Sequence, residues 1–191
     1  MLEALEIGRT KERASELVWA LCRGGFVGEF ELKEGELGGG WFQPVGVGLV
    51  LVDQMTKFLV EEGMRVGLEV PILPGLFSLT RVHNTGVAFG MAQGNNLLTG
   101  VLALVSLIFA GWMAREWDWR ERWVQVVAGL VAGGAVGNLI DRVRLGYVLD
   151  FLDFHYGAWS WPAFNVADAA ISVGVGCLLL GWVTGRSVEK K

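Results

Sequence analysis

The sequence is poor in cysteine, histidine and charge. Its 191 residues include 2 Cys and 2 His, and only 19% are Asp, Glu, Lys or Arg. Cys22 lies in a polar segment and Cys177 in an apolar run, without clustered Cys and His, which excludes a disulfide framework and argues against structural zinc. Because 16 Lys and Arg face 20 Asp and Glu, no basic surface is available for a phosphate backbone, and nucleic-acid binding is disfavoured.

Several catalytic signatures are also missing. The chain contains neither H-E-x-x-H nor G-x-S-x-G, so a zinc protease and a serine-elbow hydrolase have no support. The two histidines, His83 and His155, are interpreted as loop residues and not as zinc ligands. Cys177, with glycine and leucine as neighbours and no basic residue beside it, is interpreted as an inert packing residue.

Long apolar runs are what the sequence has in abundance. Apolar residues make up 52% of the chain, and about 20 of them in a helix span roughly 30 Å, the thickness of a hydrocarbon core. Three runs are uncharged apart from Asp168 in the last, and an earlier run is interrupted by Pro44, Asp53 and Lys57. The four runs cover residues 38–60, 93–114, 123–140 and 163–184. The sequence therefore predicts a mainly α-helical membrane protein with four transmembrane helices.

Basic residues near the ends of the runs predict the orientation, because cytoplasmic loops are enriched in Lys and Arg. The connection before the third run and the C-terminal tail contain Arg115, Arg120, Arg122, Arg186, Lys190 and Lys191. We therefore expect both termini in the cytoplasm and residues 62–92 and 143–162 outside. Residues 1–40 are interpreted as an atypical N-terminal extension without assigned function, residues 41–185 as one four-span domain, and residues 186–191 as a cytoplasmic tail.

The first outer segment predicts β-structure. Residues 64–90 alternate apolar and polar side chains between Pro and Gly breaks, which is typical of two or three short strands. A small extracytoplasmic β platform is the expected result.

Polar residues inside apolar runs indicate where chemistry is expected, because each is costly unless it is paired or faces a cavity. Asp53 and Lys57 are four residues apart and share a helix face, as a structural ion pair or as part of a site. Asn138, Asp141 and Arg142 also share a face, at the outer end of the third run. Arg142 can hold a carboxylate in a bidentate fork.

Two carboxylates are expected to meet at the outer membrane boundary. Asn165 and Asp168 share a helix face, and Asp150 lies in an extended segment 18 positions before Asp168. Two close carboxylates share a proton, so the ionised one can take a proton from water while the protonated one polarises a peptide carbonyl. This is aspartic-protease chemistry. Asn84, in an Asn-Thr-Gly segment, belongs either to an ordinary turn or to the same site.

Five blocks of residues resemble the motif blocks of the lipoprotein signal peptidase (signal peptidase II) family. They are Asp53-Gln54-Met55-Thr56-Lys57, Asn84-Thr85-Gly86-Val87-Ala88-Phe89, Gly133-Gly134-Ala135-Val136-Gly137-Asn138-Leu139-Ile140-Asp141-Arg142, Val148-Leu149-Asp150-Phe151 and Phe164-Asn165-Val166-Ala167-Asp168. Each block alone is weakly specific, but five in this order and spacing, over about residues 45–185, are highly specific. Ala169 departs from the pattern, because the family often has Ser there.

The resemblance implies a bacterial inner-membrane aspartic endopeptidase that removes the signal peptide from diacylglyceryl-modified prolipoproteins, cutting just before the lipidated cysteine. It implies that Asp150 and Asp168 are the catalytic pair, at the extracytoplasmic face, with no metal and no organic cofactor. The residues that it places as substrate-binding or supporting are Asp53, Lys57, Asn84, Asn138, Asp141, Arg142 and Asn165. For Arg142 it suggests contact with a carbonyl or a lipid head group. The expected partners are the prolipoprotein and membrane lipid, and the protein is expected to act as a monomer.

Two other functions stay open at this point. A small transporter or proton-relay protein would also place Asp, Asn and Arg within the membrane, although here these groups gather at one face. A noncatalytic scaffold, or an inactive relative of the family, would use the same aspartates in ion pairs alone.

Overall fold

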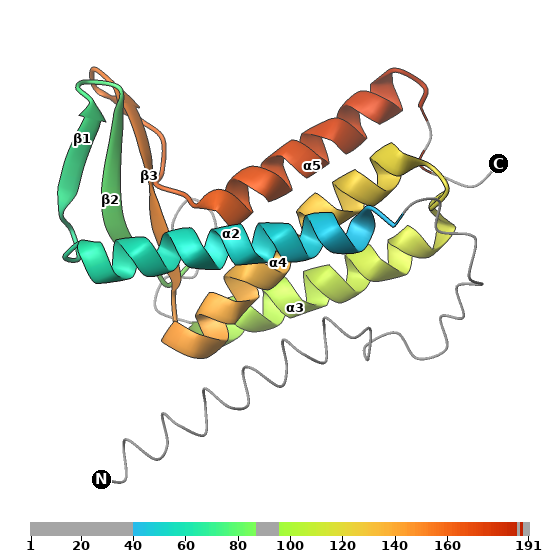
Figure 1. Cartoon of the computed structure of the whole chain (residues 1–191), viewed down its shortest axis with the longest axis horizontal. Helices are drawn as coiled ribbons and strands as arrows, with labels where there is room; N and C mark the ends of the chain where they lie inside the picture. Colours follow the sequence, from blue (N-terminus) through green and yellow to red (C-terminus); the bar gives the residue numbers. More distant parts are fainter. Residues whose placement is uncertain (1–39, 87–95, 187, 189–191) are drawn as a thin grey trace, which may run out of the picture.

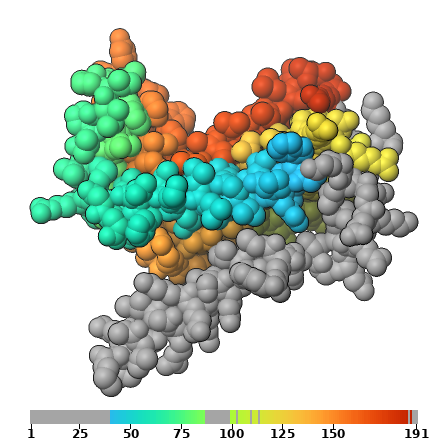
Figure 2. Space-filling view, in the orientation of Figure 1, coloured from blue at the N-terminus to red at the C-terminus, as the bar shows by residue number. Residues whose placement is uncertain are grey.

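The computed structural model describes residues 40–86, 96–186 and 188, so residues 1–39 of the predicted extension lie outside the described residues. The described chain has four α-helices, one short 3-10 turn at Ala114–Glu116 and four strands. Helix α4 packs against α2, α3 and α5, and the sheet stands at one end of the helices (Figure 1). The sheet and the far end of α5 rise on either side of a hollow (Figure 2).

The four helices match the four predicted runs. They are α2 (Phe42–Gly63), α3 (Asn96–Met113), α4 (Arg122–Leu145) and α5 (Val166–Val183). Three of them, α3, α4 and α5, are long and apolar enough to cross a membrane, whereas α2 is not in this group. Pro44 does not interrupt α2, because it falls in the first turn, where the backbone N–H has no partner within the helix.

Helix α4 packs against the other three helices and approaches two of them through glycine. A Cβ on Gly133 would lie 2.7 Å from the carbonyl oxygen of Gly46 in α2, and a Cβ on Gly134 would lie 2.5 Å from that of Ala167 in α5. Because real Cβ atoms do not approach so closely, this side-by-side packing depends on glycine.

The sheet is antiparallel throughout. Its strands, in spatial order, are β1 (Glu69–Leu73), β2 (Phe77–Asn84), β3 (Val148–Tyr156) and β4 (Trp159–Ser160). The strands predicted within residues 64–90 are confirmed by β1 and β2. The interpretation of His83 and His155 as loop residues is wrong, because strand pairing continues through them: His83 of β2 pairs with Leu149, and His155 of β3 pairs with Ser160.

The sheet is held to the helices at the beginning of β3 and the end of α2. Val60 of α2 packs with Leu149 and Phe151 in a small buried core. Arg81 of β2 donates hydrogen bonds from Nη1 to the carbonyl oxygens of Glu61 and Met64, at 2.7 and 2.8 Å, and so satisfies acceptors that the end of α2 leaves free. The polar residues singled out in the sequence lie around this junction.

Candidate active site

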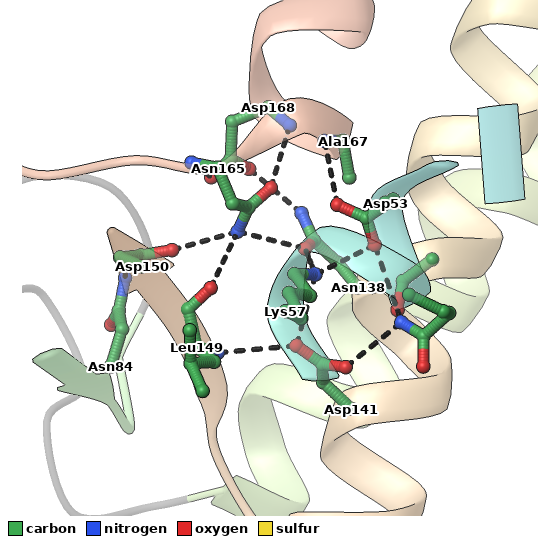
Figure 3. A network of polar contacts seen from close by, with 12 residues as sticks. Asp53, Lys57, Asn84, Asn138, Asp141, Leu149, Asp150, Asn165, Ala167 and Asp168 are labelled. Carbon is green, nitrogen blue, oxygen red and sulfur yellow. Dashed lines mark hydrogen bonds and ion pairs between the residues drawn. The ribbon is translucent and has the colours of Figure 1, made fainter. Parts of the chain in front are cut away.

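A buried cation lies at the centre of the junction (Figure 3). The Nζ of Lys57 lies 2.9 Å from Oδ2 of Asp53 and 2.9 Å from Oδ2 of Asp141, and all three side chains have 0% exposure. The predicted ion pair of Asp53 and Lys57 is thus confirmed, and α4 adds a second carboxylate to it. Lys57 also donates to Oδ1 of Asn138 at 3.0 Å, which gives each of its three N–H donors an acceptor. Buried charges are tolerated only when they are satisfied in this way.

The carboxylates of this ionic cluster (Asp53, Lys57 and Asp141) also bind backbone from two other elements. Oδ1 of Asp53 accepts the N–H of Ala167 in the first turn of α5 at 2.9 Å. Oδ2 of Asp141 accepts the N–H of Leu149 in β3 at 3.1 Å. The ionic cluster therefore fixes the starts of α5 and β3 relative to α2 and α4.

Gln54 is a member of this network that sequence reasoning did not single out. Its Nε2 donates to Oδ2 of Asp53 at 3.2 Å, to Oδ1 of Asp141 at 3.0 Å and to the carbonyl of Gly137 at 3.1 Å. Its amide therefore bridges the two carboxylates. The available signal was its position as an uncharged polar residue between Asp53 and Lys57 in an apolar run.

Asn138 links the ionic cluster to Asp168 through hydrogen bonds. Lys57 can only donate, so it requires the amide oxygen of Asn138 to face it, and the amide N–H2 is left to point the other way. That nitrogen donates to Oδ1 of Asp168 at 2.7 Å. The predicted common face of Asn138 and Asp141 is confirmed in that both contact Lys57.

Asp168 is held by the N-terminal cap of α5. Asn165 is the N-cap residue: its side-chain oxygen accepts the N–H of Asp168 at 3.0 Å, and its own N–H donates to Oδ2 of Asp168 at 3.2 Å. This reciprocal capping box uses up the first free N–H groups of the helix. It also places the Asp168 carboxylate at the positive end of the helix dipole.

Asp150 lies in β3 and is 2% exposed. Its Oδ1 accepts from Nδ2 of Asn165 at 2.7 Å, and its Oδ2 accepts from Nδ2 of Asn84 at 2.9 Å. Burial, and next the charge of Asp168, raise the pKa of Asp150 to about 7, although the hydrogen bonds from Asn84 and Asn165 oppose the shift. A carboxyl group in this range can be protonated near neutral pH.

Asn84 and Arg142 connect the loop that follows β2 to the junction. Asn84 ends β2, and its Oδ1 accepts the N–H of Gly86 at 3.0 Å, so the residue makes a turn and also contacts Asp150. Arg142 donates from Nη2 to the carbonyl of Gly86 at 2.9 Å and from Nε to Oγ1 of Thr99 in α3 at 3.3 Å. It therefore contacts different partners from its neighbour Asp141.

The structure brings together eight of the nine residues singled out in the sequence in one connected set of contacts, and Arg142 joins it through the Gly86 turn. The carboxyl groups of buried Asp150 and half-buried Asp168, each accepting hydrogen bonds from two sides, lie where a β-strand meets the start of an apolar helix. Apolar helices that could cross a membrane and a pair of neighbouring aspartates are the features of a membrane-embedded aspartic peptidase.

Comparison with known proteins gives the family. Residues 45–184 match the family described as signal peptidase (SPase) II. The lipoprotein signal peptidase of Symbiobacterium thermophilum is 44% identical over 142 residues, which cover 74% of this chain and 91% of that protein. The lipoprotein signal peptidase of Trichormus variabilis is 48% identical over 130 residues, which cover 68% and 80%.

A solved structure agrees with this assignment. A bacterial membrane enzyme determined by the in meso method at 2.3 Å resolution superposes with a TM-score of 0.65 and 28% identity, covering 77% of this chain and 90% of that one. The chain belongs to the lipoprotein signal peptidase family, also called signal peptidase II. It is thus an aspartic peptidase of the membrane, and the alternative of a transporter or proton relay is set aside.

Proposed function

We propose that Asp150 and Asp168 are the catalytic pair of this signal peptidase. The observation that carries the proposal is the position of Asn165, whose Nδ2 donates to Asp150 while its Oδ1 accepts the backbone N–H of Asp168. Asn165 therefore holds the strand carboxyl through its side-chain amide and the helix carboxyl through its backbone N–H. Such a shared anchor is what a two-carboxylate mechanism requires, because both groups must act on one peptide bond.

The shared proton is assigned to Asp150. Asp168 accepts from the Asn138 amide and from the Asn165 backbone N–H at the start of α5, and both the donors and the helix dipole favour a negative charge there. Asp150 has a pKa raised to about 7 by burial and by the charge of Asp168. At slightly acidic to neutral pH the pair then holds one proton.

In this state the two groups have complementary tasks. The Asp168 carboxylate takes a proton from a water molecule while the oxygen of that water attacks the peptide carbonyl carbon. The Asp150 carboxyl donates a hydrogen bond to the carbonyl oxygen. As the C–N bond breaks, the proton held by Asp168 passes to the leaving amine. The products are a free carboxyl group and a free amine, and the proton originally held on Asp150 is retained by the pair.

The remaining site residues act on this pair or on the substrate. The ionic cluster fixes Asn138 and the starts of α5 and β3, so Asp53, Lys57 and Asp141 are positioning residues. Arg142, beside the loop that follows β2, is the candidate contact for a substrate carbonyl or a lipid head group. The peptide cut is that of a diacylglyceryl-modified prolipoprotein, just before the lipidated cysteine, as the family resemblance implies and as the names of the relatives support.

The proposed setting is a bacterial inner membrane. Helix α2 has 22 residues, which is about 33 Å of helix and long enough to cross with the other three. It is proposed as the fourth span, with buried Asp53 and Lys57 facing α4 and not lipid. The basic connection and tail are then cytoplasmic, the sheet and the catalytic pair are extracytoplasmic, the protein acts as a monomer, and the cleavage reaction uses no metal or organic cofactor.

A gel-shift assay tests the proposal. The purified protein in detergent is incubated with a diacylglyceryl-modified prolipoprotein, beside Asp150→Asn, Asp168→Asn and the control Asp118→Asn, which changes the connection between α3 and α4. We expect cleavage by the parent and by the control, and a loss of at least about 1,000-fold in each dyad variant. Cleavage by either folded dyad variant would contradict the assignment, and a folded parent without cleavage would indicate an inactive relative.

A further inference from the structure

A second cluster of potential ligands lies on the sheet, away from the catalytic pair. Glu69 of β1 and Asp153 and His155 of β3 each offer one ligand atom, and these atoms lie within 4.8 Å of one another. Glu69 accepts a hydrogen bond from Ser78, and Asp153 lies beside His155. Among the described residues, no Lys or Arg forms an ion pair with either carboxylate. Two acids and an imidazole therefore face one another without a permanent cation.

The strand register explains why these side chains meet. Asp153 and His155 are two residues apart in β3, so they project from the same face of the sheet. Asp153 lies opposite Ser78 of the central strand β2, and Oγ of Ser78 donates to Oε1 of Glu69 at 2.8 Å. Because serine is short, the carboxylate of the edge strand can reach across β2 toward β3.

The donor set suits a borderline divalent transition metal. Imidazole nitrogen with carboxylate oxygen is a ligand combination of zinc, whereas magnesium and calcium prefer oxygen alone. Nδ1 of His155 lies 3.9 Å from Oδ2 of Asp153, too far for a hydrogen bond. Two ligand atoms that each lie about 2.1 Å from one tetrahedral ion are roughly 3.4 Å apart, so the distance between Nδ1 and Oδ2 is slightly too long. Contraction by about half an ångström would bring both onto the same metal.

We propose that Glu69, Asp153 and His155 bind one Zn²⁺ ion, with water as the fourth ligand, and that the ion fastens the edge strand β1 across β2 to β3. All five residues of β1 are exposed, and in the part of the chain that the structure describes β2 is the one strand that pairs with it, so an additional cross-strand bond would hold it in place. Ser78 orients Glu69 as the outer hydrogen-bond partner that metal ligands commonly have. The ligand atoms come from β1 and β3, and the zinc ion belongs to the platform and not to the reaction.

The zinc site and the catalytic pair are separate on the same strand. Asp153 follows Asp150 by three residues, and this odd spacing puts their side chains on opposite faces of β3. Cleavage should therefore continue without zinc, while the platform gains order when zinc is bound.

Zinc binding by the full-length protein tests the site. Detergent-solubilised protein is stripped with a chelator, equilibrated with ZnCl₂, separated from free metal and measured for bound zinc by mass spectrometry. The variants His155→Gln and Glu69→Gln each remove one ligand, and His83→Gln removes the other imidazole of the chain as the matched control. We expect each ligand variant to bind one equivalent less than the parent, or at least tenfold more weakly, and the control to bind as the parent does.

Amide hydrogen exchange is a second measurement, which reports the ordering of the backbone and not the amount of bound metal. Zinc should slow amide exchange in β1 of the parent and leave it unchanged in His155→Gln. Equal zinc content in all four folded proteins, or no zinc in the parent, would overturn the proposal. Glu69 is exposed, so Glu69→Gln keeps the test valid if His155→Gln does not fold. The proposed peptidase is tested independently, since its cleavage should persist in chelator.

Discussion

At the residue scale, Asn165 joins two tasks that usually belong to different side chains. It ends the extended segment, caps α5 and donates to Asp150. The cap could be predicted from the spacing of Asn165 and Asp168, because N-cap and N3 positions are local in sequence. The contact between Asn138 and Lys57, separated by 81 positions, could not be predicted from spacing, since it depends on how α2 and α4 pack.

Substitution of Asn165 separates these two tasks. Asn165→Ala removes both the cap and the Asp150 contact, and we expect it to lower the free energy of unfolding by about 1 kcal/mol or more and to abolish most cleavage. Asn165→Ser keeps a capping oxygen and loses the amide donor, so its stability should lie closer to that of the parent while cleavage stays low. Thermal unfolding and the gel-shift assay measure the two effects. Recovery of cleavage in Asn165→Ser would show that the contact with Asp150 is dispensable.

The pH dependence follows from Asp150. Since its pKa is raised from 3.8 to about 7, its proton is lost as pH rises through about 7, and kcat/KM should fall there as the high-pH limb of a bell-shaped profile. The free energy of unfolding should also fall as pH rises. Because the folded state favours the protonated form of Asp150, its stabilising contribution is complete below about pH 4 and is lost as pH rises through about 7. Initial cleavage rates between pH 5 and 9 measure the limb. A rate that stays constant to pH 9 would contradict the assignment of the proton.

At the element scale, α4 is the helix that contacts the other three helices and β3. The uncharged run that predicted it stops at residue 140, and the helix continues to Leu145, where the chain leaves it at Gly146, whose φ is +81°. This left-handed position is the usual glycine C-terminus of a helix. The helical spacing predicted for Asp141 and Arg142 is thus confirmed, since both lie within α4.

Gly137 of α4 affects both helix packing and the site. A Cβ added there would lie 2.6 Å from Oδ2 of Asp53, so Gly137→Ala should displace the ionic cluster, destabilise the protein by about 1 to 3 kcal/mol and reduce cleavage. Gly176→Ala in α5 is the matched control, because nothing lies within 4 Å of its added Cβ. Thermal unfolding and cleavage are measured for both. Equal behaviour of the two variants would show that α2 and α4 can separate without loss of function.

At the scale of the whole molecule, local patterns predicted the helices and two strands, while the assembly of the site depended on distant contacts. Apolar runs and strand alternation are local signals, and they gave the four helices and the first two strands of the platform. The pairing of β2 with β3, which brings Asn84 to Asp150, joins segments separated by two helices. No local pattern specifies such a register.

The family match begins at residue 45, and all contacts of the site lie after it. A chain that begins at Leu37 should therefore retain cleavage within about twofold of the parent. The truncated and full-length proteins are compared for yield of folded protein, thermal unfolding and cleavage. Loss of folded protein on truncation would show that the first 36 residues are part of the domain.

The buried ionic cluster has a consequence for the order of synthesis. Asn138 follows Lys57 by 81 positions, and at about 5 to 20 residues per second a ribosome needs roughly 4 to 16 s to reach it. Throughout that interval, the carboxylate of Asp53, one turn away in the same helix, is the acceptor that the nascent chain already supplies. The pair of Asp53 and Lys57 is therefore the part of the ionic cluster that can form before α4 is made, and it persists in the finished structure.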